Sequence, residues 1–143
     1  MINKSVFLDT NIVIDIISST RKGHKQALQL ISYLLMNDYE IVISEDMLTT
    51  LFYISSHKQK TLLFIKEIIL VDWKIVSFGR DIVKKAIDLS LKKGLDLEDV
   101  LQCLCAKENG CEILITQDKS FYDCGLSIST VEEFFKIATK LEG

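Results

Sequence analysis

Short apolar runs and longer stretches of mixed polarity alternate along this chain. The apolar runs are rich in β-branched residues, and polar residues or glycine bound each of them. They lie at residues 5–8, 40–43, 73–77, 112–115 and 126–129. Runs of this length and composition are typical of buried β-strands, so we predict about five strands.

The stretches between the runs carry apolar residues three and four positions apart, which is the spacing of one face of an α-helix. Five helices are marked in this way, by Leu28, Ile31, Leu34 and Leu35, by Met47, Leu48, Leu51 and Phe52, by Ile82, Ala86 and Leu89, by Leu97, Val100, Leu101 and Leu104, and by Val131, Phe134, Phe135 and Ala138. Strands that alternate with helices, without a hairpin signal between consecutive strands, indicate a parallel sheet with helices on both faces. The predicted fold class is therefore α/β.

The composition predicts one compact domain that spans residues 1–143. The chain has 143 residues, 48% of them hydrophobic and 26% charged, and it contains no proline. This composition is that of an ordinary globular domain, without a linker or a disordered tail. The first residues lack the long apolar stretch of a secretory signal, and Lys66 and Glu67 interrupt the longest apolar run. We therefore expect a cytoplasmic protein without a membrane anchor.

The charge balance limits how this chain could bind nucleic acid. Its net charge is −3, and its sequence pI is near 5.4. Both values argue against a broad basic face of the kind that grips a phosphate backbone. A polyanionic partner would need positive charge from another source, and a bound divalent metal ion is one candidate.

The cysteines are Cys103, Cys105, Cys111 and Cys124. They form no CxxC pair and have no histidine at metal-ligand spacing, and the chain is not a small secreted scaffold. We predict reduced thiols that mostly pack in the interior of a cytosolic protein.

Aspartates follow two of the predicted strands at the point where each strand ends. Asp9 follows the first run, in VFLDTNIVID, and Asp118 follows the fourth, in EILITQD. Asp96 and Asp99 lie near the start of the helix before that fourth run, and their spacing of three residues puts them on one helical face. Ligands of parallel α/β sheets bind beyond the carboxyl ends of the strands, so we expect these acids to meet there.

Carboxylates that share a crevice repel one another unless they are protonated or bind cations. Hard oxygen ligands of this kind suit Mg²⁺ or Mn²⁺. Such ions lower the pKa of a bound water and stabilise the attacking and leaving oxygens of a phosphodiester. The chemistry that this set of acids implies is phosphoester hydrolysis.

Most of these acids also have a structural interpretation. Asp96, Glu98 and Asp99 open a helix, where the helix dipole favours negative charge. Asp118 could begin a turn in which its side chain binds its own backbone. Taken alone, the helical cluster is more often structural than functional.

Asp9 is harder to explain by helix capping, because Thr10 or Asn11 could fill that role. Asp15 lies four residues after Asn11 and shares its helical face. Two interpretations of Asp15 stay open: it orients the site or meets a basic side chain, or it is a solvated or capped acid.

Three segments resemble the PIN-domain nucleases, a family that includes the VapC-type toxins of bacterial toxin–antitoxin pairs. VFLDTNIVIDII is similar to the opening motif of the family, LDLEDVLQCLCAKENGCEILITQDKSFY to its second half, and STVEEFF to its usual ending. The match is collinear over nearly the whole chain. It implies a three-layer α/β/α fold with a central parallel sheet in a Rossmann-like arrangement.

The resemblance also implies a role for each matched residue. It makes Asp9, Asp99 and Asp118 the catalytic, metal-binding acids. It makes Asn11 and Thr116 residues that support Asp9 and its surroundings through hydrogen bonds.

Other positions match only a part of the family or depart from it. Asp96 and Glu98 match acids of a subgroup in which a supporting or second-metal role is plausible. Many members carry an acid on the helix after the second strand, where this chain has the neutral Thr50. Glu45 or Asp46 could compensate, but acids in a first helical turn are typical of an ordinary helix N-terminus, and we favour that capping role.

The function implied by the resemblance is an Mg²⁺- or Mn²⁺-dependent endoribonuclease that hydrolyses phosphodiester bonds of single-stranded RNA. It would be the toxin of a toxin–antitoxin pair, with an antitoxin as its protein partner, and it would form a homodimer. The alternative is a catalytically weakened module that binds RNA or protein, because Thr50 is neutral. A phosphatase of the haloacid-dehalogenase type would need an acid where Asn11 stands, and the acid pairs and lysine of a receiver domain are missing.

The segment TRKGHK, residues 20–25, is the densest positive patch of the chain. Arg21 and Lys22 could contact an RNA backbone beside the crevice. The commoner meaning of such a run is a solvated loop that opens the next helix.

Overall fold

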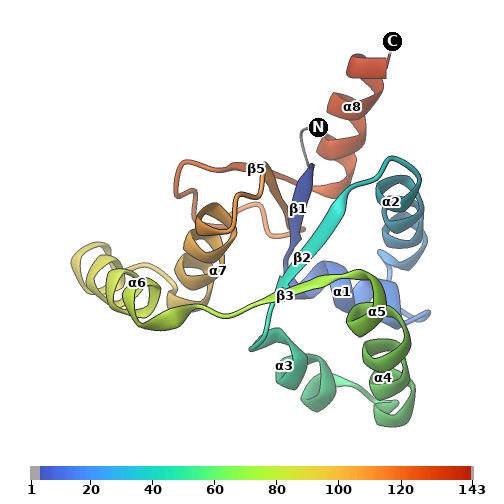
Figure 1. Cartoon of the computed structure of the whole chain (residues 1–143), viewed down its shortest axis with the longest axis horizontal. Coiled ribbons are helices and arrows are strands. Elements are labelled where there is room, and N and C mark those ends of the chain that lie inside the picture. Colours follow the sequence, from blue (N-terminus) through green and yellow to red (C-terminus); the bar gives the residue numbers. More distant parts are fainter. Residues whose placement is uncertain (1–3, 143) are drawn as a thin grey trace.

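The structure is a computed structural model that describes residues 4–142, with side chains described up to residue 139. All five predicted runs contain a strand: β1 (Ser5–Leu8), β2 (Glu40–Ser44), β3 (Lys74–Val76), β4 (Ile113–Ile115) and β5 (Ser127–Ser129). They form one parallel sheet in the order β3-β2-β1-β4-β5 (Figure 1). The predicted α/β fold class is confirmed.

The central strand is buried on both faces, which explains why its sequence is a continuous apolar run instead of an alternating one. Val6, Phe7 and Leu8 are fully buried. Phe7 pairs with Val42 of β2 on one side and with Leu114 of β4 on the other. β1 is therefore the strand around which both halves of the sheet assemble.

Helices fill the segments between the strands. They are α1 (Thr10–Ile17), α2 (His24–Met36), α3 (Met47–Ile54), α4 (Lys58–Phe64), the π-helical turn η1 (Ile65–Ile69), α5 (Leu70–Asp72), α6 (Gly79–Lys93), α7 (Leu97–Glu108) and α8 (Val131–Glu142). The apolar spacing predicted helices at α2, α3, α6, α7 and α8. It did not resolve α4, η1 and α5, where apolar residues occur on several faces: Ile69 is fully buried while Leu70 beside it is 60% exposed.

The core face of α7 differs from the predicted one. Leu97 is 43% exposed, whereas Val100, Cys103 and Ala106 are fully buried. The reason is that α7 packs on β2 and β4 while α6 packs on α7, so burial follows two contact surfaces and not one stripe of leucines.

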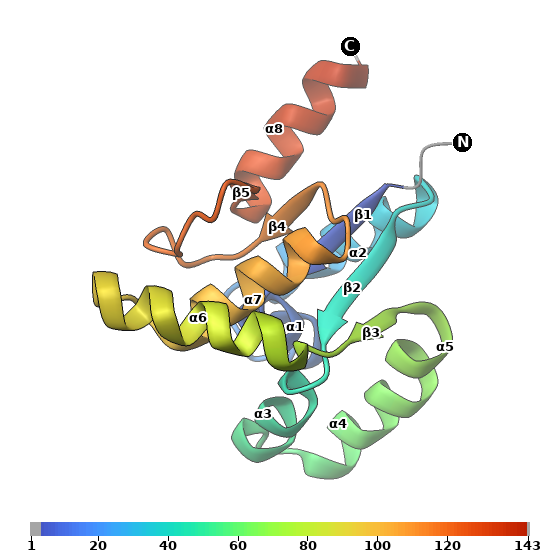
Figure 2. The same ribbon diagram turned by 60° about the vertical axis from the view of Figure 1, so that its left-hand side comes forward.

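The layers are seen best in Figure 2. α7, with α6 outside it, covers one face of the sheet, and α1 and α2 cover the other, with α8 packed beside α2. The chain leaves β1 toward β2, whereas β4 is reached by a crossover from β3, so the strand order reverses between β1 and β4. In sheets of this kind the ligand site lies beyond the carboxyl ends of the strands at that reversal. Asp9 follows β1, and Asp118 follows β4.

The prediction of four reduced thiols is wrong for one pair of cysteines. Cys103 on α7 and Cys124 in the loop before β5 form a disulfide, with a Cα–Cα distance of 6.0 Å. The two residues are 21 positions apart, and only the packing of the loop on α7 brings them together. Cys105 and Cys111 are free and buried, as predicted. Burial raises the pKa of Cys105 to about 11 and that of Cys111 to about 12, so both stay as packing thiols.

Most buried hydrophobic residues between Val6 and Ala138 belong to one cluster. That the domain extends over all of residues 1–143 stays a prediction, because residues 1–3 and 143 lie outside the described part. Among the helices that the structure describes, none is long and apolar enough to cross a membrane.

Candidate functional site

Asp9 stands at the carboxyl end of β1 and is itself the N-cap of α1. Its Oδ1 accepts a hydrogen bond of 2.7 Å from the backbone N–H of Thr10. Its own backbone N–H donates to the carbonyl oxygen of Ile115 at 3.0 Å, which ties it to β4. Capping is therefore carried out by Asp9 and not by Thr10 or Asn11, but it occupies only one of the two carboxylate oxygens.

The second oxygen of Asp9 enters a hydrogen-bond network with β4 and the residues after it. Oδ2 accepts from Thr116 Oγ1 at 2.7 Å and from Asn11 Nδ2 at 3.2 Å. Thr116 is fully buried, and its hydroxyl oxygen also accepts from Asn11 Nδ2 at 3.2 Å and from the Asp118 backbone N–H at 3.1 Å. Asn11 Oδ1 accepts from the Gln117 backbone N–H at 3.2 Å. The network orients Asp9 and links it to the segment that carries Asp118.

The start of α7 contributes three acids, one at the N-cap and two in the first turn. Gly94, at φ 65°, ends α6 in the left-handed conformation, and the chain turns back so that α7 begins beside the sheet edge. Asp96 is the N-cap, and its Oδ1 accepts from the Asp99 backbone N–H at 3.1 Å. Asp96 and Glu98 are exposed and Asp99 is half-buried. Asp96 thus has the structural role considered above, although capping again engages only one of its oxygens.

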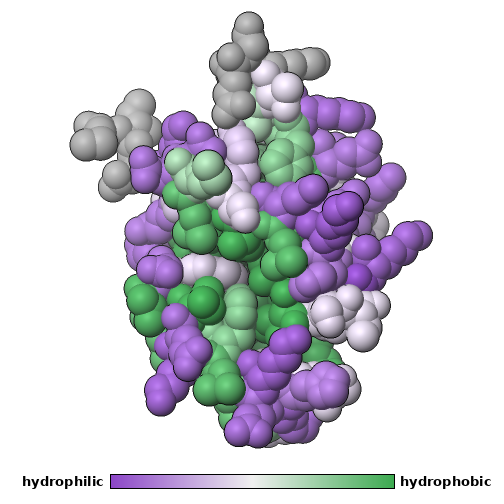
Figure 3. Space-filling view, turned by 90° about the vertical axis from the view of Figure 1, so that its right-hand side faces the viewer, coloured by the Kyte–Doolittle hydropathy of each residue, from purple (hydrophilic) through white to green (hydrophobic). Residues whose placement is uncertain are grey.

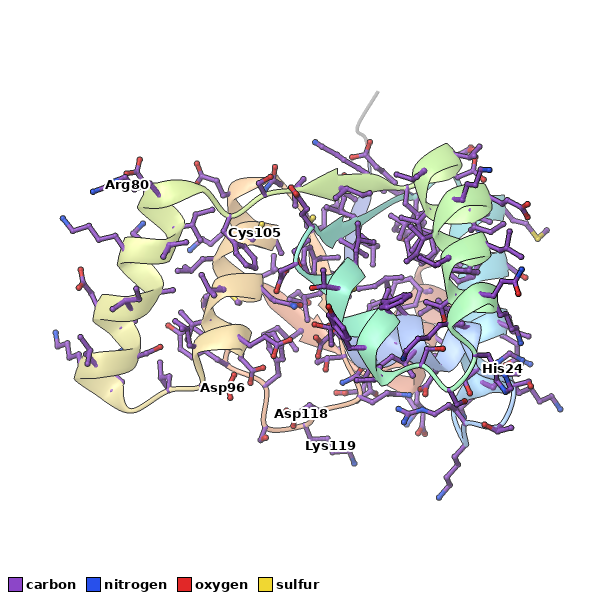
Figure 4. The ribbon with its side chains drawn as sticks, turned by 90° about the horizontal axis from the view of Figure 1, so that it is seen from below. His24, Arg80, Asp96, Cys105, Asp118 and Lys119 are labelled. Atoms are coloured by element: carbon purple, nitrogen blue, oxygen red, sulfur yellow. A yellow bond between two sulfur atoms is a disulfide. The ribbon has the colours of Figure 1, made fainter. Side chains whose placement is uncertain are left out.

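Asp118 lies in the loop after β4, at the same end of the molecule as Asp96 (Figure 4). Its Oδ1 accepts from the backbone N–H of Ser120 at 2.9 Å and from the Ser120 hydroxyl at 2.7 Å, as in the turn that the sequence allowed. These hydrogen bonds lower the pKa of Asp118. A hollow of about 380 Å³ adjoins it, with Thr116 and Lys119 among its lining residues.

Three acids at this edge are harder to ionise than ordinary carboxyls. Burial, and then the negative charges of Asp96, Asp9 and Asp118, raise the pKa of Asp99 to about 6. Burial raises the pKa of Asp9 against its hydrogen bonds from Thr116 and Thr10, and the pKa of Glu98 is raised by burial and by nearby acids, Asp9 first among them. These effects show that acids from β1, α7 and the loop after β4 lie within electrostatic reach of one another.

No counter-cation accompanies these acids in the part of the chain that the structure describes. Its two ion pairs join Arg21 to Asp15 and Lys136 to Glu132, away from the cluster. Within residues 4–139, no three His, Cys, Asp or Glu side chains are grouped closely enough to hold one metal ion as they stand. We call the carboxylates of Asp9, Asp96, Glu98, Asp99 and Asp118 the acidic edge. Their negative charges are not compensated by an ion pair among the described residues, and Asp118 accepts hydrogen bonds from Ser120.

The predicted capping role of Glu45 and Asp46 is wrong. Neither side chain caps α3; Glu45 Oε2 accepts from the Ser77 hydroxyl at 2.9 Å, and Asp46 accepts from the hydroxyl of Ser44. The negative charge of Asp46 contributes to the raised pKa of Glu98, which places Asp46 near the acids of α7. The sequence analysis considered such a role for Asp46 but favoured capping, although Asp46 follows the end of β2 much as Asp9 follows β1. Thr50 lies one helical turn further along α3, on the face of Asp46, and is half-buried.

Gln102 is a further residue that no sequence signal indicated. It lies one turn after Asp99 on α7 and is fully buried. Neither its amide nitrogen nor its amide oxygen has a hydrogen-bond partner among the described residues. Burying an amide without hydrogen bonds costs free energy of folding, and no contact of Gln102 offsets that cost among the described residues.

The basic segment after α1 is built around Asp15. Asp15 is 5% exposed, and its Oδ1 accepts from Arg21 Nε at 3.0 Å. Of the two interpretations left open, the structure therefore supports contact with a basic side chain. Arg21 and the exposed Lys22 lie beyond the last residue of α1, whereas Asp9 lies before the first. The 8 residues of α1 span about 12 Å, so the structure does not bring Arg21 and Lys22 into the acid cluster.

Comparison with known proteins agrees with this geometry. The family model of the PIN domain matches residues 6–125. The chain is 40% identical over 138 residues to Ribonuclease VapC1 of Aquifex aeolicus (strain VF5), an alignment that covers 94% of this chain and 95% of that protein.

Solved structures share the fold at lower identity. VapC20 of Mycobacterium tuberculosis, described as a sarcin-ricin loop cleaving toxin, superposes with a TM-score of 0.69 at 11% identity and covers 85% of this chain and 95% of its own. A toxin–antitoxin complex from Klebsiella pneumoniae superposes with a TM-score of 0.65 at 22% identity, and the match covers 88% of this chain and 97% of that chain. VapBC2 of Rickettsia felis, bound to a DNA fragment from its promoter, superposes with a TM-score of 0.66 at 21% identity. This match covers 88% of this chain and 98% of that chain. The family match over most of the chain confirms the resemblance seen in the motifs: this chain belongs to the PIN-domain family.

Proposed function

We propose that this protein is a metal-dependent endoribonuclease that hydrolyses phosphodiester bonds of single-stranded RNA, with Asp9, Asp99 and Asp118 as its catalytic acids. The observation that carries the proposal is the uncompensated acidic edge at the reversal of strand order. Mutually repelling carboxylates without a cation are costly, and a site that binds a cation for catalysis gives a reason to keep them. The name of the 40% identical relative, a ribonuclease, supports the same activity.

The chemistry of the donor set fits Mg²⁺ or Mn²⁺. The groups at the edge are carboxylates, which are hard oxygen ligands, and no lysine or arginine pairs with them among the described residues. A divalent cation bound here would supply positive charge for the phosphodiester and would activate water for attack. Asp9 would be the preoriented ligand, because Thr116, Asn11 and Thr10 hold its oxygens. Asp118 would bind the ion through Oδ2, because both hydrogen bonds from Ser120 go to Oδ1.

Asp96 and Glu98 take supporting places in this proposal. Both are exposed beside Asp99, so they can hold a second cation or keep the local potential negative. One oxygen of Asp96 caps α7, so Asp96 would bind a cation only through its other oxygen.

Asp46 compensates, in our proposal, for the neutral Thr50. Asp46 directly precedes α3, and Thr50 follows it four positions later on that helix. The negative charge of Asp46 contributes to the raised pKa of Glu98. The alternative function, a weakened module that binds RNA or protein without cutting, follows if no acid takes that place.

The test is cleavage of a defined single-stranded RNA in Mn²⁺, in Mg²⁺ and in EDTA. We expect metal-dependent cutting that falls by roughly 100-fold or more in Asp9→Asn, since even the loss of a group behind a metal ligand costs 10- to 100-fold. The Asp9→Asn protein, purified identically, also exposes any contaminating ribonuclease. Equal cutting by both proteins, or none in any metal while RNA is bound, would leave the binding module as the better account.

The same assay tests Asp46 against a matched neighbour. Asp46→Asn is expected to weaken cleavage and to raise the Mn²⁺ concentration needed for half-maximal rate, by about tenfold. Glu45→Gln is the control, because the carboxylate of Glu45 binds Ser77 and has no part in the proposed site. If both variants behave alike, Asp46 does not replace the acid missing at Thr50.

The proposal extends to partners. We infer that the protein is the toxin of a toxin–antitoxin pair in the cytoplasm, in keeping with the VapC relative and with neighbours solved as toxin–antitoxin complexes. A cavity of about 540 Å³ between α1, α3 and α4 has an apolar wall and Arg21, His57 and Lys60 at its polar side. It suits a peptide with apolar and acidic side chains, and we assign it to the antitoxin. Arg21 and Lys22 stay predicted RNA contacts.

A homodimer is also part of the proposal. Large apolar side chains are exposed on the adjoining helical segments α4, η1 and α5, and Figure 3 shows the apolar patch on the face where these segments and α2 lie. The exposed residues of this α4–α5 surface are Leu62, Leu63, Ile68, Leu70 and Val71. Single exposed apolar side chains are normal on a protein surface, but these five lie on adjoining segments. Such a surface suits contact with a second copy of the chain.

A further inference from the structure

The disulfide joins the two segments that carry acids on either side of the site. Cys103 lies on α7 four residues after Asp99, so both residues occupy one helical face. Cys124 lies six residues after Asp118, in the loop between β4 and β5. The bond therefore connects the helix of Asp99 to the loop of Asp118.

Cys124 joins the far end of this loop to α7. Residues 116–126 contain no helix or strand. Phe121 is buried and anchors the middle of the loop. Beyond Phe121, the Cys124 backbone N–H donates to Cys103 Sγ at 3.3 Å, and Lys107 Nζ donates to the Cys124 carbonyl oxygen at 3.2 Å. Tyr122 and Leu126 pack against the core, and both hydrogen bonds to α7 converge on Cys124. This end of the loop is therefore joined to α7 through Cys124.

The disulfide acts against a repulsive force. Ionised Asp118 and Asp99 carry like charges, and no cation pairs with either among the described residues. A loop released from α7 would move so as to separate these like charges. A covalent link keeps the loop in place in the absence of metal.

We propose that Cys103 and Cys124 are redox-dependent positioning residues, whose disulfide holds the Asp118 loop against α7 and so strengthens divalent-cation binding by the acid cluster. This inference rests on the proposed function, because it assumes that the cluster binds a cation. It makes the oxidised protein the tighter metal binder and the reduced protein the weaker one.

The reductive step is an ordinary exchange with a dithiol. One thiolate of the dithiol attacks Cys124, the partly exposed partner, and the S–S bond breaks with Cys103 leaving as a thiolate that takes up a proton. The second thiol of the reductant then displaces Cys124 and closes a disulfide within the reductant. Two electrons and two protons pass from the dithiol to the cysteines.

The experiment compares one unchanged chain in two redox states. Free thiols are counted by alkylation and mass spectrometry, before and after treatment with dithiothreitol and its removal by gel filtration under argon. The affinity for Mn²⁺ is then measured by calorimetry, and exchange of backbone amides is followed in residues 117–126. We expect two free thiols before reduction and four after it, a Kd about tenfold higher in the reduced form, and faster exchange in this loop.

Variants separate the effect of the bond from that of the reductant. Cys124→Ser is expected to bind Mn²⁺ like the reduced protein and to ignore dithiothreitol. Cys111→Ser keeps the bond and should retain the full response, because Cys111 is a free buried thiol. Circular dichroism of each variant establishes that it is folded.

Three results would overturn the inference, and they differ in what else they imply. Four free thiols in protein purified without reductant would mean that the bond does not form. Equal Mn²⁺ affinity in both redox states would refute positioning by the bond and leave the proposed nuclease intact. No Mn²⁺ binding in either state, by folded protein, would count against the proposed function as well.

Discussion

Asp99 combines two effects that hold its carboxyl in the neutral form, partial burial and the charges of three neighbouring aspartates. Together they raise its pKa to about 6. For a carboxyl with a raised pKa, the folded protein binds a proton that the unfolded chain releases at the same pH. Metal-free protein therefore gains stability from this group as the pH falls from above 6 toward the ordinary pKa of an aspartate, near 4. A metal ion reverses the preference, because it binds the ionised form.

We predict that Mn²⁺ affinity rises with pH and is half-maximal near pH 6. We also predict that the metal-free protein melts at a higher temperature at pH 5 than at pH 7. Asp99→Asn should raise the melting temperature of the metal-free protein at pH 7 and abolish its increase on adding Mn²⁺. Thermal scans with and without Mn²⁺ measure both effects. A variant that is still stabilised by the ion as strongly as the parent would remove Asp99 from the metal site.

At the scale of elements, the connection between α1 and α2 depends on one missing side chain. Gly23 has φ −85°, which any residue can adopt, so backbone freedom does not explain it. A Cβ atom at this position would overlap the carboxylate of Asp15, the buried partner of Arg21. Glycine is needed here so that the start of α2 can approach that ion pair closely.

Gly23→Ala is accordingly predicted to destabilise the protein by about 1–3 kcal/mol, the usual cost of an overpacked interior. Urea unfolding followed by circular dichroism gives this value. Lys22→Ala, at the exposed neighbour, is the control and should stay within about 0.5 kcal/mol of the parent. A tolerated Gly23→Ala would mean that Asp15 and Arg21 can move aside at little cost.

Element prediction succeeded where burial imposes a simple period. The five strands are short apolar runs in a sheet covered on both faces, and each was found from the sequence within one or two residues of its ends. α4, η1 and α5 were not resolved because their apolar residues face both the interior and the exposed α4–α5 surface. A pattern that serves two surfaces has no single hydrophobic face to detect.

For the molecule as a whole, the α4–α5 surface is the feature that an isolated monomer leaves unexplained. Val71 is 70% exposed and Leu70 60%. Burying such side chains against a second copy would stabilise a dimer through the same apolar effect that stabilises the core.

We therefore predict that Val71→Glu weakens self-association at least about tenfold, measured by sedimentation velocity across a concentration series. Leu91→Glu is the matched control: Leu91 is 81% exposed but lies on α6, outside this surface. A parent protein that sediments as a monomer at all concentrations would refute the homodimer, and equal weakening by both variants would move the interface elsewhere.

Local periodicity and motifs contiguous in the chain were enough to predict the fold class, the strands and the PIN-domain resemblance. They were also enough to propose Asp9, Asp99 and Asp118 as the acids of the site. The tertiary structure alone decided which distant groups meet. It paired Cys103 with Cys124, brought Asp46 at the start of α3 toward the acids of α7, and separated Arg21 from them by the length of α1. The physical reason is that hydrophobic patterning records whether a residue is buried, whereas disulfides, charge clusters and ion pairs depend on distances that exist only after the elements have packed.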